Sequence, residues 1–175
     1  HSVHVELTGL EPARWYWYRF MAGDTVSPIG RTRTAPAPDA ALERLMAGNQ
    51  RYVEGVSRRH DFKSEREALA KGQNPYAGIL SCADSRIAPG YAFDSGRGDL
   101  FVVRVAGNFA TEDGIASFEY AVQVLNTPLL LVLGHQACGA VDATIKSIKD
   151  NTTLPGHLPA LVAAISPAVN AVLDR

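Results

Sequence analysis

The sequence lacks three features that would each assign a protein to a class. It has no excess of either charge, because 17 Lys and Arg residues against 18 Asp and Glu residues leave a formal net charge of -1. Without a basic surface we expect no nucleic acid or anionic lipid as a partner. It has no long apolar run, since the densest one, residues 129–133, is far too short to span a bilayer. We therefore expect no membrane span.

Cysteine is also scarce, with Cys82 and Cys138 as the two in the chain. This number excludes a small fold held together by several disulfides. From the count alone, two buried thiols and one disulfide both remain open as interpretations. The residues around these cysteines add a third interpretation, a metal site.

The first 34 residues differ in pattern from the rest of the chain. Aromatic and β-branched residues recur at period two in residues 3–7, 15–20 and 30–34, and Gly and Pro separate these runs. This pattern predicts three short antiparallel strands, a partial β-sandwich-like segment. Residues 35–38 alternate Ala and Pro, which predicts a stiff, extended linker to a second domain at residues 39–175.

The second domain has an α/β pattern. Asp39 is a suitable N-cap for a helix that ends near Gly48, and another helix is expected at residues 65–70. Short apolar runs at residues 76–81, 100–105 and 129–133 alternate with helical patterns at residues 114–125 and 138–149. The fold class that this order predicts is a parallel β-sheet flanked by helices.

The reactive side chains follow the apolar runs directly. Cys82 comes after the first run, and His135 and Cys138 come after the third. Ligands of open parallel sheets bind beyond the carboxyl ends of the strands, so we expect these residues to converge if the two strands are neighbours. Two cysteines and one histidine suit Zn²⁺ with one coordination position left open, as in catalytic zinc sites.

Asp84 and Arg86 follow Cys82 at a spacing of two residues each. A guanidinium that binds both carboxylate oxygens would keep Asp84 ionised and fixed in direction. Beside a metal, such a carboxylate could orient a hydroxide. The alternative is an ordinary surface ion pair.

Four motifs carry a resemblance to a known family. Residues 81–86 (SCADSR), 132–139 (VLGHQACG), 101–108 (FVVRVAGN) and 47–52 (AGNQRY) resemble the motifs of β-class carbonic anhydrases, in the family's order. The similarity runs from about residue 39 to residue 175. Because members of the family continue with a further helix and a final strand, we expect this domain to be incomplete at its C-terminus.

The resemblance implies a function and a set of roles. Zinc would be bound by Cys82, His135 and Cys138, and zinc-bound hydroxide, oriented by the Asp84–Arg86 pair, would attack carbon dioxide to give bicarbonate and a proton. The family also implies a homodimer or larger homo-oligomer, with a substrate pocket built partly across the dimer interface. In some members the equivalent of Asp84 binds zinc in a closed resting state. The implied pocket residues are Gln73, Phe101 and Tyr120.

The N-terminal segment resembles the last strands of the N-terminal domain of PhoD-type alkaline phosphatases. It contains none of that family's metal ligands, so no catalytic role is inferred from it. PhoD-type enzymes are exported, which leaves the compartment open between a cytoplasmic default and the periplasm or cell envelope.

Three alternatives to carbonic anhydrase activity stay open. Relatives of the fold can hydrolyse carbon–sulfur compounds, and pocket shape decides between these substrates. A non-catalytic zinc module would bind metal without hydrating carbon dioxide. The fusion of the two segments could also be an artefact of a gene boundary.

Overall fold

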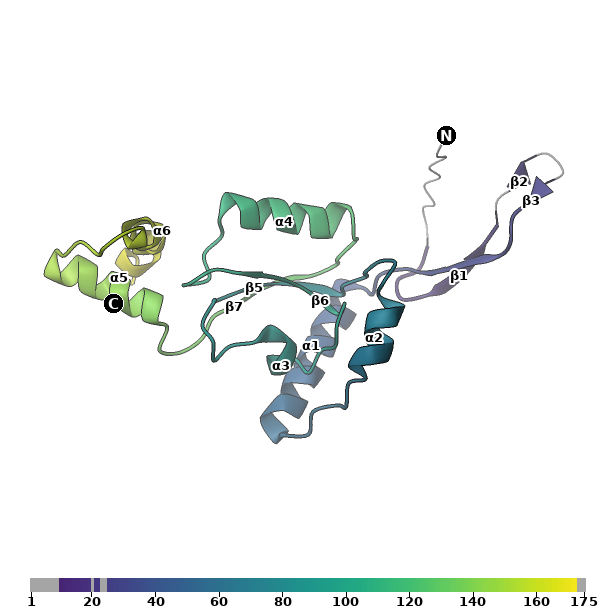
Figure 1. Cartoon of the computed structure of the whole chain (residues 1–175), viewed down its shortest axis with the longest axis horizontal. Helices are drawn as coiled ribbons and strands as arrows, with labels where there is room; N and C mark the ends of the chain where they lie inside the picture. The colour runs from purple at the N-terminus through teal and green to yellow at the C-terminus, as the bar shows by residue number, and fades with distance from the viewer. Residues whose placement is uncertain (1–9, 20, 23–24, 173–175) are drawn as a thin grey trace.

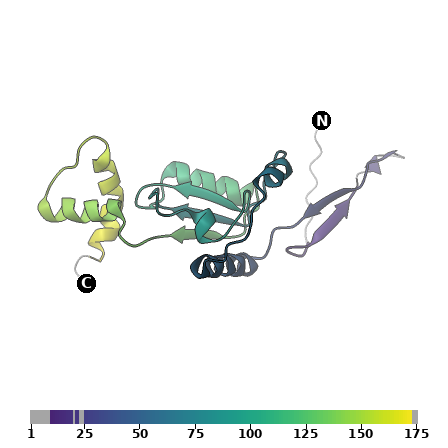
Figure 2. The ribbon, with the colours of Figure 1, turned by 60° about the horizontal axis from the view of Figure 1, so that its bottom comes forward.

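The computed structural model describes residues 10–19, 21–22 and 25–172. A β-hairpin lies at one end of the molecule, a three-stranded sheet with helices lies in the middle, and a pair of helices lies at the other end (Figures 1 and 2). No helix among the described residues is both long enough and apolar enough to cross a membrane.

The hairpin is built from antiparallel pairs. β1 (Trp15–Tyr18) pairs with β4 (Gly30–Arg33), and the short strands β2 (Met21–Ala22) and β3 (Thr25–Val26) pair beyond them. These pairs confirm the strands predicted at residues 15–20 and 30–34. The strand predicted at residues 3–7 lies outside the described residues.

α1 (Pro38–Glu54) begins earlier and ends later than the sequence pattern predicts. Its N-cap is Ala37, so the prediction of Asp39 as the N-cap was wrong, and Asp39 lies in the first turn. Pro38 accounts for the difference, because its fixed φ angle and missing N–H suit the first position of a helix. The helix ends at Gly55, whose φ of 71° is the left-handed conformation favoured by glycine.

Two further short helices follow α1. α2 (Phe62–Ala68) begins before the predicted residue 65, because the Asp61 side chain accepts hydrogen bonds from the N–H groups of Lys63 and Ser64. α3 (Pro89–Ala92) was not predicted, since four residues are too few to show a helical period.

The central sheet confirms the predicted fold class. β5 (Ala77–Ser81), β6 (Leu100–Arg104) and β7 (Leu130–Leu133) are parallel and lie in the order β6-β5-β7. α4 (Glu112–Gln123) covers one face of the sheet, and α1 and α3 lie on the other (Figure 1). As the middle strand covered on both faces, β5 is buried at all five positions.

The core lies mainly between α1 and the sheet. Its buried cluster joins Ala41 and Leu45 of α1 to Ile79 of β5 and to Phe93 after α3. On the opposite face, Gly78 allows α4 to approach closely, since a Cβ at this position would lie 3.2 Å from the Phe118 ring and 2.5 Å from Leu130. Helices therefore pack against both faces of β5. This packing holds in place the carboxyl end of the strand, where the chain leaves the sheet.

The last two helices pack against each other. α5 (Gly139–Asp150) matches the predicted helix to within one residue at each end, and α6 (Leu158–Asn170) follows it. The pair lies beyond the carboxyl ends of the strands, at the end of the molecule opposite the hairpin (Figure 2). α5 thus begins where the sheet's carboxyl edge ends.

Candidate metal centre

The topology brings the two metal-ligand segments to one point. Ser81, the last residue of β5, is paired with Leu133, the last residue of β7. Cys82 directly follows β5, His135 follows β7 after one glycine, and Cys138 is the N-cap residue of α5. The prediction that the two strands are neighbours is therefore confirmed.

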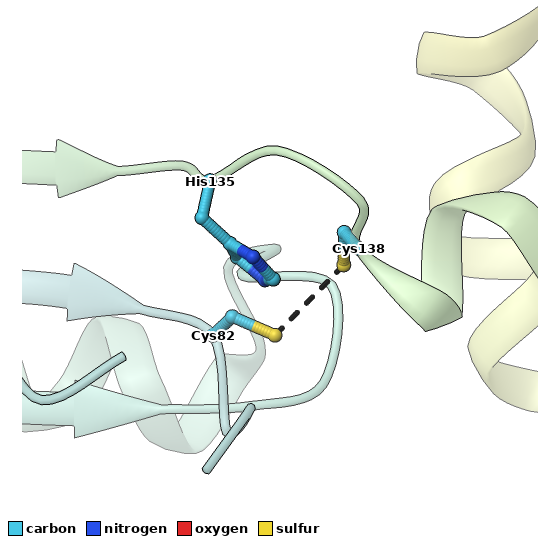
Figure 3. Close-up of side chains that lie close together, drawn as sticks. All are labelled: Cys82, His135 and Cys138. Atoms are coloured by element: carbon cyan, nitrogen blue, oxygen red, sulfur yellow. Dashed lines mark hydrogen bonds between the residues drawn. The ribbon is translucent and has the colours of Figure 1, made fainter. Parts of the chain in front are cut away.

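The three side chains converge beyond the sheet (Figure 3). The Sγ atoms of Cys82 and Cys138 are 3.9 Å apart, and one ligand atom from each of the three residues lies within 4.8 Å of the others. Both cysteines are free, and a disulfide would require about 2.05 Å between the sulfur atoms. Among the described residues, this is the one group of three or more side chains that could hold a metal ion.

His135 is oriented as a metal ligand. Its Nδ1 lies 2.9 Å from the Gln136 carbonyl oxygen, which can only accept, so Nδ1 carries the proton. Its Nε2 is fully buried and has no hydrogen-bond partner. Leaving a buried polar atom unpaired is costly, whereas a metal would use this lone pair. With two thiols beside it, the donor set fits zinc, which Cys82, His135 and Cys138 would hold.

The Cys82 thiol is prepared to lose its proton. Burial raises its pKa, but the backbone N–H groups of Gly107 and Asp84 point at the sulfur from 3.3 and 3.4 Å. Together with the neighbouring side chains they lower the pKa to about 7. A substantial fraction of thiolate, the form that binds metal, is therefore present near neutral pH even without a cation.

Asp84 and Arg86 form a two-point ion pair beside the cluster. Arg86 donates from Nε to Oδ1 at 2.9 Å and from Nη2 to Oδ2 at 2.7 Å, and its backbone N–H donates to Oδ1 at 2.9 Å. These hydrogen bonds hold the pKa of Asp84 well below its usual value. Asp84 Oδ2 lies 4.0 Å from Nε2 of His135, so an ionised acceptor faces the metal ligands.

Two arginines fix the loops that carry the ligands. Arg86 also donates from Nη2 to the carbonyl oxygen of Ala137 at 3.0 Å, and Ala137 has a left-handed φ of 51° between the two ligands of that loop. Arg104, the last residue of β6, donates to the carbonyl oxygens of Cys82 at 2.9 Å and of Asp84 and Ile87 at 2.7 Å. Sequence reasoning missed Arg104, although a charged residue inside an apolar run was a usable signal.

The residues expected to form the substrate pocket lie elsewhere in the chain. The rings of Phe101 and Tyr120 are 6.4 Å apart, and Phe101 is paired with Gly78 near the amino ends of the strands. Gln73 is exposed in the loop that precedes β5. Because the metal ligands follow the carboxyl ends, one chain does not bring these three residues to its own metal centre.

A hollow of about 340 Å³ lies next to the Asp84–Arg86 pair. Arg86 and Gly134 line it on the side of the metal loops, and Tyr52 and Tyr91 line it on the side of α1 and α3. The hollow is large enough for a small substrate and water.

The structure thus has a Cys₂His cluster whose donor set fits zinc at the carboxyl edge of a parallel sheet, with a fixed carboxylate beside it. Residues 77–175, more than half of the chain, match the carbonic anhydrase family. The chain belongs to this family, in its β class, as the motifs predicted.

Individual relatives agree with this assignment. "Carbonic anhydrase 2" of Mycobacterium tuberculosis is 46% identical over 134 residues, which cover 75% of this chain and 64% of the relative. A carbonic anhydrase of Mycolicibacterium smegmatis is 41% identical over 133 residues, with coverages of 75% and 65%. The chain therefore spans slightly less than two thirds of the length of these relatives.

Solved structures show the same fold. The β-carbonic anhydrase CcaA superposes with a TM-score of 0.58 at 32% identity, covering 78% of this chain and 62% of that one. A tetrameric β-carbonic anhydrase of Sordaria macrospora gives a TM-score of 0.58 at 22% identity, with coverages of 78% and 64%, and it shows the fold alone.

The N-terminal segment has a different relationship. Residues 1–36 match the N-terminal domain of PhoD-like phosphatases. Alkaline phosphatase D of Bacillus subtilis is 48% identical over 58 residues, 31% of this chain and 10% of that protein. The resemblance of this segment to PhoD-type enzymes is confirmed.

Proposed function

We propose that the protein catalyses the reversible hydration of carbon dioxide to bicarbonate and a proton, with zinc held by Cys82, His135 and Cys138. One observation carries the proposal: an unpaired, buried Nε2 of His135 lies with two thiols and an ionised Asp84 at the carboxyl edge of the sheet. The similarity to carbonic anhydrases of M. tuberculosis and M. smegmatis supports the choice of substrate.

Zinc bound at this site would supply Lewis acidity, which lowers the pKa of a water molecule towards neutrality. The contribution of Asp84 follows from its charge. With its pKa held low it carries no proton, so it can only accept a hydrogen bond. A hydroxyl group that donates to Asp84 would have its lone pairs turned away from the carboxylate and free to attack carbon dioxide.

Arg86 makes this orientation rigid. It binds both oxygens of Asp84 and the Ala137 carbonyl, so the carboxylate is fixed relative to both ligand loops. Because both oxygens are already engaged, the arrangement favours a resting state in which Asp84 accepts a hydrogen bond rather than binding the metal. The reaction takes one water and one carbon dioxide and releases bicarbonate and one proton, which passes to solvent.

We further propose that Gln73, Phe101 and Tyr120 serve the metal centre of a second copy in a homodimer. Their place near the amino ends of the strands, away from the ligands of their own chain, supports this arrangement. A mixture of Cys82→Ser and Tyr120→Phe chains, unfolded and reassembled together, tests it. Mixed dimers contain one site with an intact metal set and an intact partner tyrosine, so hydration activity that neither parent shows is expected. A mixture no more active than its parents contradicts it.

Zinc content and hydration rate together test the main proposal. We expect about one zinc per chain and fast hydration, followed by stopped flow with a pH indicator. Cys82→Ser should lose both zinc and activity. Ser117→Ala should keep both, because the Ser117 hydroxyl donates only to the Asp113 carbonyl oxygen within α4. Zinc binding without hydration would contradict the catalytic proposal, and a folded wild-type protein that binds no zinc would contradict the metal site.

A further inference from the structure

A second lined cavity lies away from the metal centre. Two adjoining hollows of about 360 and 260 Å³ share four lining residues, and none of the metal ligands borders them. We call this region the arginine–aromatic hollow, and its shared lining consists of Arg58, His60, Gly96 and Arg97. Its size is within the range of small-molecule sites.

Two of the three carboxylates that line the arginine–aromatic hollow, those of Asp94 and Asp99, are paired with arginines. Asp94 is bound by Arg51 at 2.5 Å and by Arg58 at 3.1 Å, and its side chain is 2% exposed. Glu65 lies 3.1 Å from Nδ1 of His60, and Asp99 is bound by Arg44 at 2.5 Å.

The guanidinium groups, in contrast, exceed the carboxylates. Within the described part of the chain, neither Arg59 nor Arg97 has a carboxylate at ion-pair distance, and both line the smaller hollow. Two arginines beside one hollow therefore leave a surplus of positive charge that an anion would balance. Their planar groups match the geometry of a carboxylate or a phosphate.

Aromatic rings supply the other half of the lining. Phe62 and Tyr91 border the larger hollow and are 60% and 76% exposed, which is high for side chains of this size. Arg97 already lies over the Phe62 ring, 5.7 Å from its centroid, and His60 stacks with Phe62 at 6.2 Å. A flat ligand would bury these aromatic faces and place its charge next to Arg97.

We propose that the arginine–aromatic hollow binds a small aromatic anion that carries a carboxylate or phosphate group. The ring would pack against Phe62 and Tyr91, and the anionic group would be bound by Arg97 and Arg59. Inorganic anions would use only the arginines, and neutral aromatics only the rings, so both bind more weakly than a molecule that has both parts. The proposal depends on none of the metal ligands, and of these four side chains Tyr91 alone also lines the hollow beside the Asp84–Arg86 pair.

The test is a titration of the ¹⁵N-labelled, zinc-loaded chain with phenyl phosphate and with benzoate, followed by amide chemical shifts. Inorganic phosphate and phenol serve as the charge-only and ring-only probes. We expect saturable shifts at Phe62, Gly96 and Arg97, and binding at least about tenfold tighter than that of either control probe. The stronger of the two anions identifies the preferred charged group.

Two variants with the same change of charge make the result specific. Arg97→Gln should weaken binding by about tenfold or more, whereas Arg66→Gln, on the exposed side of α2, should leave it unchanged. Equal weakening by both variants would reduce the effect to general surface charge and overturn the proposal. Shifts confined to residues 134–138, or no saturation at about 20 mM, would overturn it as well. Since hydration is measured separately, failure here leaves the proposed enzymatic activity standing, and the reverse also holds.

Discussion

Two regions of this molecule each contain an aspartate bound by arginine, but the ion pair has a different role in each region. Asp84 is bound by Arg86, two residues away in the sequence, and its second oxygen faces the metal ligands at 4.0 Å. Asp94 is bound by Arg51 and Arg58, which lie 43 and 36 residues away, and its carboxylate is almost completely buried. The Asp84 pair joins neighbours in the sequence and leaves the carboxylate facing the metal ligands. The Asp94 pairs join residues far apart in the sequence and are buried.

This difference separates two properties of an ion pair: the direction it gives to a carboxylate, which matters for function, and the links it makes between distant segments, which stabilise the fold. A pair between sequence neighbours links no distant segments, so its value lies in the direction it gives to the carboxylate. A buried pair between α1, the following loop and the turn after α3 links three segments, and removing one partner leaves the other charges uncompensated. Asp84 should therefore control rate, and Asp94 should control stability.

Asp94→Asn should have the largest energetic effect. It removes a buried charge while two arginines stay in place, so we expect the free energy of unfolding to fall by about 3 kcal/mol. Asparagine is the appropriate substitute because Asp94 has a left-handed φ of 43°, a conformation that Asn adopts more readily than Ala. Urea unfolding measures the loss, and the hydration rate per folded molecule should stay close to that of the wild type. A stable but inactive variant would remove the distinction between the two regions.

Asp84→Asn should have the opposite result, a slower hydration rate with an unchanged free energy of unfolding. The variant keeps the shape of the side chain but loses the charge, so the hydrogen-bond acceptor beside the metal is weaker and its NH₂ group can take the wrong orientation. We expect hydration to slow by about 10- to 100-fold while zinc content and urea stability stay near wild-type values. Stopped-flow hydration and metal analysis of the same sample check this. An unchanged rate would show that Asp84 is an ordinary surface ion pair.

The sequence predicted one of these regions and not the other, for a physical reason. Short apolar runs that end at Cys82 and at His135 predicted the parallel strands and the convergence of the ligands, because burial on both faces leaves a local pattern. The Asp84–Arg86 pair was also visible, since both residues lie in one motif. The Asp94 cluster joins residues that only tertiary packing brings together, and nothing in the spacing of Arg51 and Arg58 indicates this partner.

Arg104→Gln should have a smaller effect, on the binding of zinc, because Arg104 supports a loop that carries a metal ligand. Arg104 holds the loop of Cys82 and Asp84 through three carbonyl oxygens and contacts no ligand atom directly. A glutamine cannot reach all three, so we expect zinc affinity to fall by about tenfold, measured by competition with a chelator. Arg104→Lys retains a cation that can donate to the same carbonyl oxygens and should recover part of this loss. Equal affinities in wild type and Arg104→Gln would show that the loop holds its shape without the arginine.

The smallest effect is a pH dependence that should distinguish Asp94 from a surface aspartate. Burial alone would raise the pKa of Asp94, but the hydrogen bonds from Arg51 and Arg58 lower it overall. A carboxyl group whose pKa is lower in the folded protein stabilises the fold above its unfolded pKa of about 3.9, and this stabilisation is lost as the pH falls through the folded value. The stability difference between wild type and Asp94→Asn, measured by urea unfolding of the metal-free protein, should be full at pH 6 and narrow below about pH 4.

Asp142→Asn is the matched control, because Asp142 pairs with Lys146 on the exposed side of α5, where such pairs contribute less than about 0.5 kcal/mol. If the Asp94→Asn difference were as small as that of Asp142→Asn at pH 6, the buried pair would stabilise the fold no more than a surface pair does.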